Sequence, residues 1–310
     1  MPNIPGIDLG PAQVRDFIDE GFVRLDGTFS PDLAATCRAA LRAEAGFKED
    51  DPGTWPGPVL RLGFRGDACF RDAPNTPRLH AAYDRLAGAG RWHAPTGLGT
   101  FPIRFPSPEP PPDTGWHVDM SFGTEAPDVL DWRVNVTSRG RALLMLFLLS
   151  DTGTNDGPTL LRAGSHRIIA RDLIGRGPEG ATLRELASDG WTSSAGCEER
   201  LATGPAGTVW LCNPFLVQAA QANRGMRPSY MAQPPLLPSG DFDPSLPPSP
   251  VQIAMREACG LSLWKTKGSP AGALPIPYCT RVQVWLAQIS PPSTQPARSS
   301  ELPFRVMLPT

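Results

Sequence analysis

An uninterrupted apolar run from Ala142 to Leu149 constrains the fold of this chain more than any other feature. Eight apolar residues are too few to span a bilayer, and such a run favours a strand that is buried on both faces. Turn-rich clusters separate this run from shorter apolar or alternating runs at 101–105, 134–136 and 208–217. Several short strands joined by turns predict an all-β core.

Helical patterns lie mainly before this core and just after it. Pro11 opens a segment in which Val14, Phe17 and Ile18 recur at helical spacing, and Gly21 ends it before a short strand at 22–25. Ser30 is a typical N-cap before a first-turn proline. Further helices are expected at 77–87 and 251–259. With 31 glycines and 37 prolines, a helical bundle is disfavoured. The expected fold class is an all-β core with flanking helices.

Three regions are expected along the chain. Residues 1–98 are predicted to supply helices and first strands that pack on the core, and residues 99–260 the core itself with a closing helix. Residues 234–250 are proline-rich and are expected to form an extended connection. Residues 261–310 are rich in Pro and Ser, with one alternating run at 282–286. No domain is assigned to this tail, and its order is left open.

Composition narrows the classes of partner and the compartment. A net charge of −2 and a pI near 6.1 give no basic surface for nucleic acid and no polybasic membrane signal. The first thirty residues do not resemble a signal peptide. The six cysteines form no CxxC pair, which is typical of reduced thiols in a cytoplasmic protein. A small-molecule substrate is expected, and the existence of a protein partner is left open.

The sharpest chemical motif is Trp116-His117-Val118-Asp119. On a strand, residues two apart point to the same face, so His117 and Asp119 would present an imidazole and a carboxylate side by side. A histidine and a carboxylate are two of the three ligands in the facial triad that holds non-haem Fe(II). The alternative is a surface histidine close to a solvated aspartate.

Further motifs follow in order: Asn155 to Pro158, Ala163 to His166, Gly207 to Leu211 and Asn223 to Pro228. This ordered set, spread from about Gly21 to Cys259, resembles the phytanoyl-CoA dioxygenase-like family of Fe(II)/2-oxoglutarate oxygenases. The resemblance implies a double-stranded β-helix (a cupin-like jelly roll) and Fe(II) and 2-oxoglutarate as cofactors. It also implies hydroxylase-type oxidation of a small organic substrate. His117 and Asp119 match the family's first metal histidine and its carboxylate.

The resemblance breaks at two positions. Gln218 stands where the family has its second metal histidine, and Ser229 where it has the arginine that binds 2-oxoglutarate. An amide oxygen can coordinate Fe(II), so Gln218 or water is expected as the third ligand beside His117 and Asp119, but an amide is a poorer donor than an imidazole. If the segment after Gly225 is a strand, Arg227 faces the same way as Ser229 from about 6.6 Å away and can supply the clamp. Arg224 is a second option. The alternative is that Arg224 and Arg227 are solvated turn residues with no ligand to bind.

Other residues keep two readings. Arg104 is expected to face either the cavity or solvent. His166 is expected in a loop outside the metal site, and Cys212 lies roughly 20 Å from Gln218 along a strand, so neither replaces the missing ligand. Trp116, Trp132 and Asn135 either wall the site or fill the core, and Asp156 is first a turn residue.

Two functions therefore stay open. One is a non-haem Fe(II)/2-oxoglutarate-dependent dioxygenase impaired by its incomplete triad. The other is a catalytically inactive jelly-roll homologue that acts as a binding or scaffold module.

Overall fold

The computed structural model describes residues 9–241 and 246–260. Thirteen strands are formed: β1 Phe22–Leu25, β2 Val59–Leu62, β3 Phe101–Arg104, β4 Gly115–His117, β5 Arg133–Val134, β6 Leu143–Leu148, β7 Leu160–Arg162, β8 Ala181–Thr182, β9 Glu199–Leu201, β10 Val209–Cys212, β11 Gln218–Ala220, β12 Ser229–Ala232 and β13 Pro235–Leu236. The α-helices are α1 Pro11–Glu20, α2 Pro31–Ala45, α3 Ala68–Asp72, α4 Pro77–Tyr83, α5 Ser165–Leu173, α6 Leu183–Leu186 and α7 Pro250–Ala258. The predicted tail at 261–310 lies outside the described residues.

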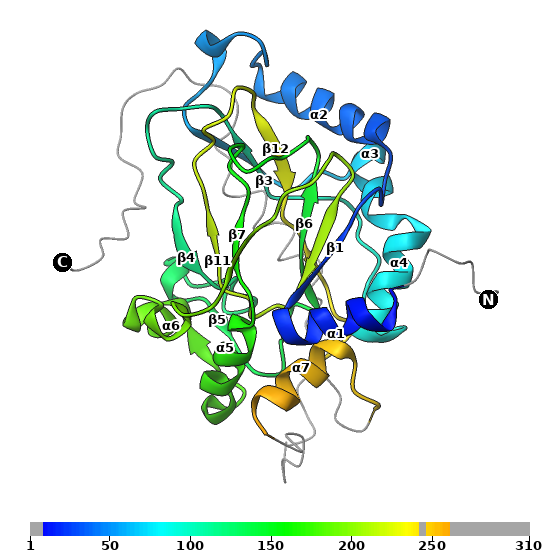
Figure 1. Ribbon diagram of the computed structural model, residues 1–310, viewed down its shortest axis with the longest axis vertical. Helices are drawn as coiled ribbons and strands as arrows, with labels where there is room; N and C mark the ends of the chain where they lie inside the picture. Colours follow the sequence, from blue (N-terminus) through cyan, green and yellow to red (C-terminus); the bar gives the residue numbers. More distant parts are fainter. Residues whose placement is uncertain (1–8, 242–245, 261–310) are drawn as a thin grey trace.

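The strands form two main antiparallel sheets. The larger one has seven strands in the order β1-β10-β6-β12-β3-β2, with β13 also pairing β6. The smaller one has the order β4-β11-β7-β9, and β5 and β8 make a separate pair. Figure 1 shows the small sheet on one side of the molecule and the larger sheet on the other, with α2, α3 and α4 outside the larger sheet. This is the predicted all-β core with flanking helices, a double-stranded β-helix.

Strand β6 is the centre of the larger sheet, and all six of its residues are buried. Leu143, Met145 and Phe147 belong to the core cluster shared with the helices. Leu144, Leu146 and Leu148 belong to a second cluster, which also holds Leu161 of the small sheet. The apolar run is therefore buried on both faces, as predicted, because helices cover one face of β6 and the small sheet covers the other.

The N-terminal region contributes to the core as well as covering it. Helix α1 buries Val14, Phe17 and Ile18, and Gly21 ends it in the left-handed conformation that glycine favours. Strand β1 follows at once and pairs with β10, while β2 pairs with β3 at the far end of the same sheet. The side chain of Ser30 accepts a hydrogen bond from the Leu33 amide, which confirms the predicted cap of α2.

Two local expectations were wrong. Strand β4 ends at His117, so Asp119 lies beyond the regular strand. Residues 165–173 form helix α5 rather than a loop, because Gly164 adopts a φ of +79° and turns the chain into the helix. In the segment expected as an extended connection, residues 235–236 also pair with β6 as β13.

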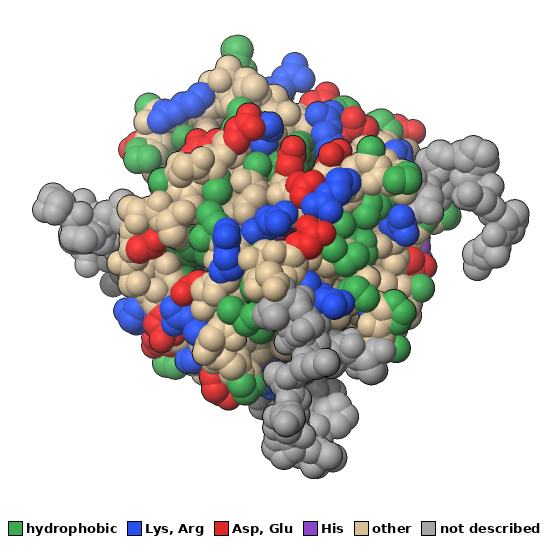
Figure 2. All heavy atoms as spheres, turned by 60° about the horizontal axis from the view of Figure 1, so that its bottom comes forward, with side chains coloured by type: hydrophobic (Ala, Val, Ile, Leu, Met, Phe, Trp, Pro, Cys, Tyr) green, Lys and Arg blue, Asp and Glu red, His purple; other side chains and the backbone are tan. Residues whose placement is uncertain are grey.

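The described part of the chain contains no helix long and apolar enough to cross a membrane. Its five cysteines, Cys37, Cys69, Cys197, Cys212 and Cys259, are free thiols. Figure 2 shows the face that carries α1, α5 and α7, on which acidic and basic side chains are interspersed. Arg15, Asp19, Arg167 and Glu257 form one ion-pair network that joins these three helices.

Candidate functional site

A cavity of about 200 Å³ lies between the two sheets. His117 and Gln218 line it from the small sheet, and Arg61, Arg104 and Gln233 line it from the side of the larger sheet. Its remaining wall includes Asp119, Met120, Val129, Trp132, Arg141 and Leu183. Charged and amide groups therefore face apolar side chains across a small space, which is the usual composition of a ligand pocket.

The register of the small sheet brings His117 and Gln218 together. Gln218 is directly opposite His117 in the antiparallel ladder of β4 and β11. Residues paired in this way point to the same face of a sheet. His117 Nδ1 lies 3.0 Å from the carbonyl oxygen of Gly115. Because a carbonyl only accepts, Nδ1 carries the hydrogen, and Nε2 is the ring nitrogen left for another partner.

The Asp119 carboxylate is held by two donors. Its Oδ2 accepts from Gln218 Nε2 at 3.0 Å and from Arg141 Nη1 at 3.3 Å. Arg141 Nη2 also donates to the Met120 carbonyl at 3.0 Å. Burial lowers the pKa of Arg141, and the neighbouring charge of Asp119 acts in the opposite direction. A guanidinium remains protonated in proteins, so Arg141 places a full positive charge against Asp119.

The other end of the Gln218 side chain is also engaged. Gln218 is fully buried, and its Oε1 accepts from Gln233 Nε2 at 3.3 Å. Reversing the amide would turn its oxygen towards the Asp119 carboxylate and its nitrogen towards Gln233. Because an ionised carboxylate only accepts, Asp119 fixes the orientation in which the amide nitrogen of Gln218 faces it.

These residues do not fit a facial-triad iron centre. Among the described residues, no group of three or more His, Cys, Asp and Glu side chains could hold a metal ion. Using Gln218 as the third ligand requires its amide to reverse, which breaks its hydrogen bonds to Asp119 and Gln233. Each hydrogen bond lost in that exchange contributes about 0.5–1.5 kcal/mol, and more where one partner is charged. The Arg141 guanidinium also repels an incoming divalent cation.

A tight loop places Arg141 at this point. Asn135 Oδ1 accepts from the backbone amide of Arg139 and from the Thr137 hydroxyl, each at 3.1 Å. At Gly140 the φ is +81°, and a Cβ would lie 2.5 Å from the Ser121 carbonyl oxygen, so only glycine allows this approach. Asn135 therefore organises the loop that delivers Arg141. Trp132, which was expected either to wall the site or to fill the core, lines the cavity.

A second arginine cluster lines the same cavity. Arg104 is buried, and it donates from Nη1 and Nη2 to the two oxygens of Asp113 at 3.0 Å each. Arg61 also donates to Asp113. Burial alone would raise the pKa of Asp113, but its bonds to Arg104 and Arg61 outweigh burial and lower that pKa to about 2. Ser229 is directly opposite Arg104 in the ladder of β3 and β12.

The two arginines proposed from sequence as the clamp lie elsewhere. Arg224 and Arg227 are both exposed, and neither lines the cavity. Arg224 Nη1 donates to the carbonyls of Ser107 and Pro108. Arg227 lines a separate open depression formed by residues 151, 153–156 and 225–229. Asp156 accepts from the Gly153 amide at 2.7 Å, as expected of a turn residue.

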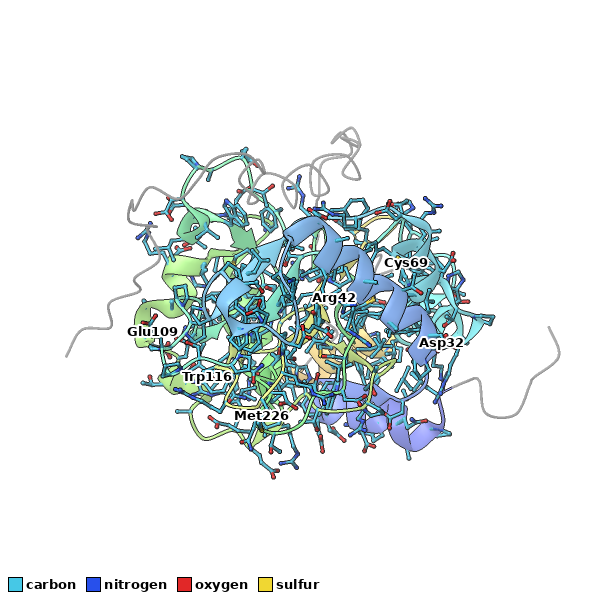
Figure 3. The ribbon with its side chains drawn as sticks, turned by 90° about the horizontal axis from the view of Figure 1, so that it is seen from above. Asp32, Arg42, Cys69, Glu109, Trp116 and Met226 are labelled. Atoms are coloured by element: carbon cyan, nitrogen blue, oxygen red, sulfur yellow. The ribbon has the colours of Figure 1, made fainter. Side chains whose placement is uncertain are left out.

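The remaining candidate residues, Trp116, His166 and Cys212, lie outside the cavity. The Arg162 guanidinium lies 3.8 Å from the centre of the Trp116 ring, on the sheet face opposite to His117. Figure 3 places Trp116 and Glu109 on one side of the molecule and Asp32 and Cys69 on the other. His166 is buried in α5, where Nε2 donates to the Ile18 carbonyl at 3.1 Å. Neither His166 nor Cys212 lines the cavity.

Sequence reasoning brought His117, Asp119 and Gln218 to one cavity but missed Arg141 and Asp113. Arg141 directly precedes the buried run, and nothing in its local pattern separates it from other arginines. Asp113 lies in a turn-rich segment of prolines and was treated as part of a loop. The contacts of both residues depend on tertiary packing, which sequence periodicity does not encode.

No protein-family model matches the sequence, and no curated protein matches it. GIG2 (DUF1479) from Candida albicans has a similar structure, with a TM-score of 0.55 at 12% identity, covering 76% of this chain and 65% of that one. Two further structures have lower TM-scores. The non-heme alpha ketoglutarate dependent carbocyclase SnoK has a TM-score of 0.47 at 19% sequence identity, and the match covers 75% of this chain and 86% of SnoK. HygX from Streptomyces hygroscopicus, with nickel and 2-oxoglutarate bound, has a TM-score of 0.45 at 18% sequence identity, and the match covers 73% of this chain and 85% of HygX. At these identities the likeness concerns the fold alone.

Proposed function

We propose that this chain is a catalytically inactive jelly-roll protein whose cavity binds a small organic ligand without a metal ion. The observation that carries the proposal is the contact of Asp119 with Arg141 and Gln218. The carboxylate expected to hold iron is already neutralised by a guanidinium, and the third ligand position offers it an amide N–H. The Arg141 guanidinium and the Gln218 amide therefore satisfy the Asp119 carboxylate, which a metal ion would otherwise satisfy.

The cavity has the features of a binding site in other respects. Its volume of about 200 Å³ is below the usual range for drug-sized ligands, which indicates a ligand of few heavy atoms. Arg61, Arg104 and His117 offer polar contacts, and Met120 and Trp132 offer an apolar wall. The expected ligand therefore has a polar or charged end and a short apolar part.

A pair of matched variants tests this function. Ala220 lines the cavity, whereas Ala222, two residues further along, does not. Ligand-detected NMR with a panel of small polar molecules should find binders in the presence of EDTA. Ala220→Phe should abolish their signals because its ring fills the cavity, and Ala222→Phe should keep them. Binders that appear only after Mn(II) is added, or that ignore Ala220→Phe, would refute metal-free binding in this cavity.

The second candidate function is an Fe(II)/2-oxoglutarate oxygenase of weak metal affinity, related to the phytanoyl-CoA dioxygenase-like proteins that the motifs resemble. It is favoured by one observation: His117 and Asp119 line one cavity, with Gln218 directly opposite His117. Anaerobic loading with Fe(II), followed by measurement of succinate formed from 2-oxoglutarate in air, tests it. Succinate above the level of a His117→Ala control would support the oxygenase. A cytoplasmic location stays a prediction from the free cysteines.

A further inference from the structure

The charges around the cavity do not balance. Three guanidinium groups line it, those of Arg61, Arg104 and Arg141. The carboxylates paired with them are Asp113, which Arg61 and Arg104 share, and Asp119. Within the described residues, the buried Arg141 Nε has no hydrogen-bond partner. One excess positive charge around a small cavity favours an anionic ligand.

The backbone of Arg104 is held rigidly, as a site for an anion requires. Arg104 pairs with Val59 of β2 on one side and with Ser229 of β12 on the other, and its carbonyl accepts from Asn223 Nδ2 at 2.9 Å. Its side chain passes over Gly157, where a Cβ would lie 2.9 Å from Arg104 Cδ. A guanidinium fixed in this way presents two parallel N–H donors, which is the geometry that binds a carboxylate.

Asp113 accepts hydrogen bonds from both of these N–H donors, but its place in the chain is less constrained than that of Arg104. It precedes β4, at the end of the segment 105–114 that connects β3 to β4 and contains no helix and no strand. Its side chain is 16% exposed, against 5% for Arg104, so it has more access to water than its partner. The carboxylate of Asp113 therefore has a solvated alternative, whereas the Arg104 guanidinium has none.

We propose that Asp113 is an internal carboxylate that occupies an anion site on Arg104 and Arg61, two arginines that line the cavity, and that the ligand is a small carboxylic acid that replaces it on them. This inference rests on the proposed metal-free binding function and names its ligand class. A ligand carboxylate reproduces both bonds to Arg104, and Asp113 turns to solvent. Competition with a tethered group keeps the affinity of the wild-type protein low.

Calorimetric titration with succinate in EDTA tests the inference. Asp113→Asn keeps the side-chain size and removes the competing charge, so succinate should bind at least about tenfold more tightly than to wild type, which corresponds to about 1.4 kcal/mol. The neutral diamide of succinate should not bind, and raising the salt concentration should weaken succinate binding. Glu109→Gln removes one charge from the exposed part of the same connecting segment and should change nothing.

Equal succinate affinity in wild type and Asp113→Asn, or binding by neither, would overturn the inference. If Asp113→Asn fails to fold, Arg61→Gln replaces it, because Arg61 is half-exposed and its loss leaves the Arg104–Asp113 pair intact. Arg61→Gln should weaken succinate binding about tenfold, and unchanged binding contradicts the inference. If wild type and Asp113→Asn bind succinate equally in EDTA, the inference about Asp113 fails, but the proposed function of metal-free binding stands. Binding that requires Mn(II) would instead refute the proposed function.

Discussion

Gln218 Nε2 lies 3.0 Å from Asp119 Oδ2, so an amide N–H occupies the place where a metal-binding site needs a lone pair. The same carboxylate oxygen accepts from Arg141, and the Gln218 oxygen is taken by Gln233. The four side chains form a continuous polar chain along the wall of the cavity. A metal ion that took Gln218 as a ligand would have to break the hydrogen bonds of its amide.

Replacing two members of the network should create metal binding. In Gln218→His/Arg141→Met, an imidazole faces Asp119 and the competing cation is gone, so His117, Asp119 and residue 218 together offer a facial set of ligands. Mn(II) should bind at least tenfold more tightly than to wild type, as measured by calorimetry under anaerobic conditions. Gln221→His, which adds a histidine outside the cavity, is the matched control and should leave Mn(II) binding unchanged.

Loss of Arg141 alone should destabilise the fold moderately. Arg141→Met keeps most of the packing of the side chain but leaves Asp119 with one donor, and Asp119 is 24% exposed and can reach water. We expect a loss of about 1–2 kcal/mol in the free energy of unfolding, measured in urea. Adding Asp119→Asn should recover part of it, with a coupling energy of about 1 kcal/mol. Strictly additive effects would show that the pair contributes nothing.

Gly157 should be intolerant of a methyl group. A Cβ there would lie 2.9 Å from Arg104 Cδ and 3.1 Å from the Gln221 carbonyl oxygen. Gly27 has a similar φ, +62° against +68°, with nothing within 4 Å of its Cβ position, so it controls for backbone strain. Gly157→Ala should lose about 1–3 kcal/mol more stability than Gly27→Ala. Equal losses in chemical denaturation would mean that Arg104 is not fixed by this contact.

His166 should make stability depend on pH. Burial lowers the pKa of His166 from 6.5 to about 4, and the bond to the Ile18 carbonyl and the charges of Arg167 and Asp19 are smaller influences. The unfolded chain therefore binds a proton more readily than the folded one between these values. The contribution of His166 is complete above pH 6.5 and is lost as the pH falls towards 4, by up to about 3 kcal/mol.

Denaturation at pH 7 and at pH 5 measures this effect. His166→Gln keeps a donor for the Ile18 carbonyl and should flatten the difference in unfolding free energy between the two pH values. His93 is exposed, so His93→Gln should leave that difference as in wild type. An unchanged difference in His166→Gln would show that other groups cause the acid sensitivity.

Part of this architecture could be read from the sequence, because part of it is periodic. The buried run that became β6 and the cap at Ser30 follow from local pattern, and both were predicted. His117, Asp119 and Gln218 were also expected at one cavity and do line it. Strand pairing explains this for His117 and Gln218, whereas Asp119 reaches the cavity from beyond the end of β4.

The parts that could not be predicted depend on contacts between distant segments. Arg141 reaches Asp119 only because Gly140 lets its loop pack against Ser121. Arg104 had two equal readings in sequence, and its burial is decided by β2 and β12 on either side. Ser229 faces Arg104 directly, so restoring an arginine at 229 would bring two guanidinium groups together, which residue spacing alone does not show.

The most direct test of a cavity closed to metal is an anaerobic titration of the wild-type protein with Mn(II), followed by calorimetry and by the electron paramagnetic resonance of free Mn(II). The contacts of Asp119 with Arg141 and Gln218 predict no saturable heat and no loss of the free-ion signal up to about millimolar Mn(II). A dissociation constant above about 1 mM corresponds to a binding free energy weaker than roughly 4 kcal/mol. Stoichiometric uptake at micromolar Mn(II), abolished by His117→Ala, would contradict the account.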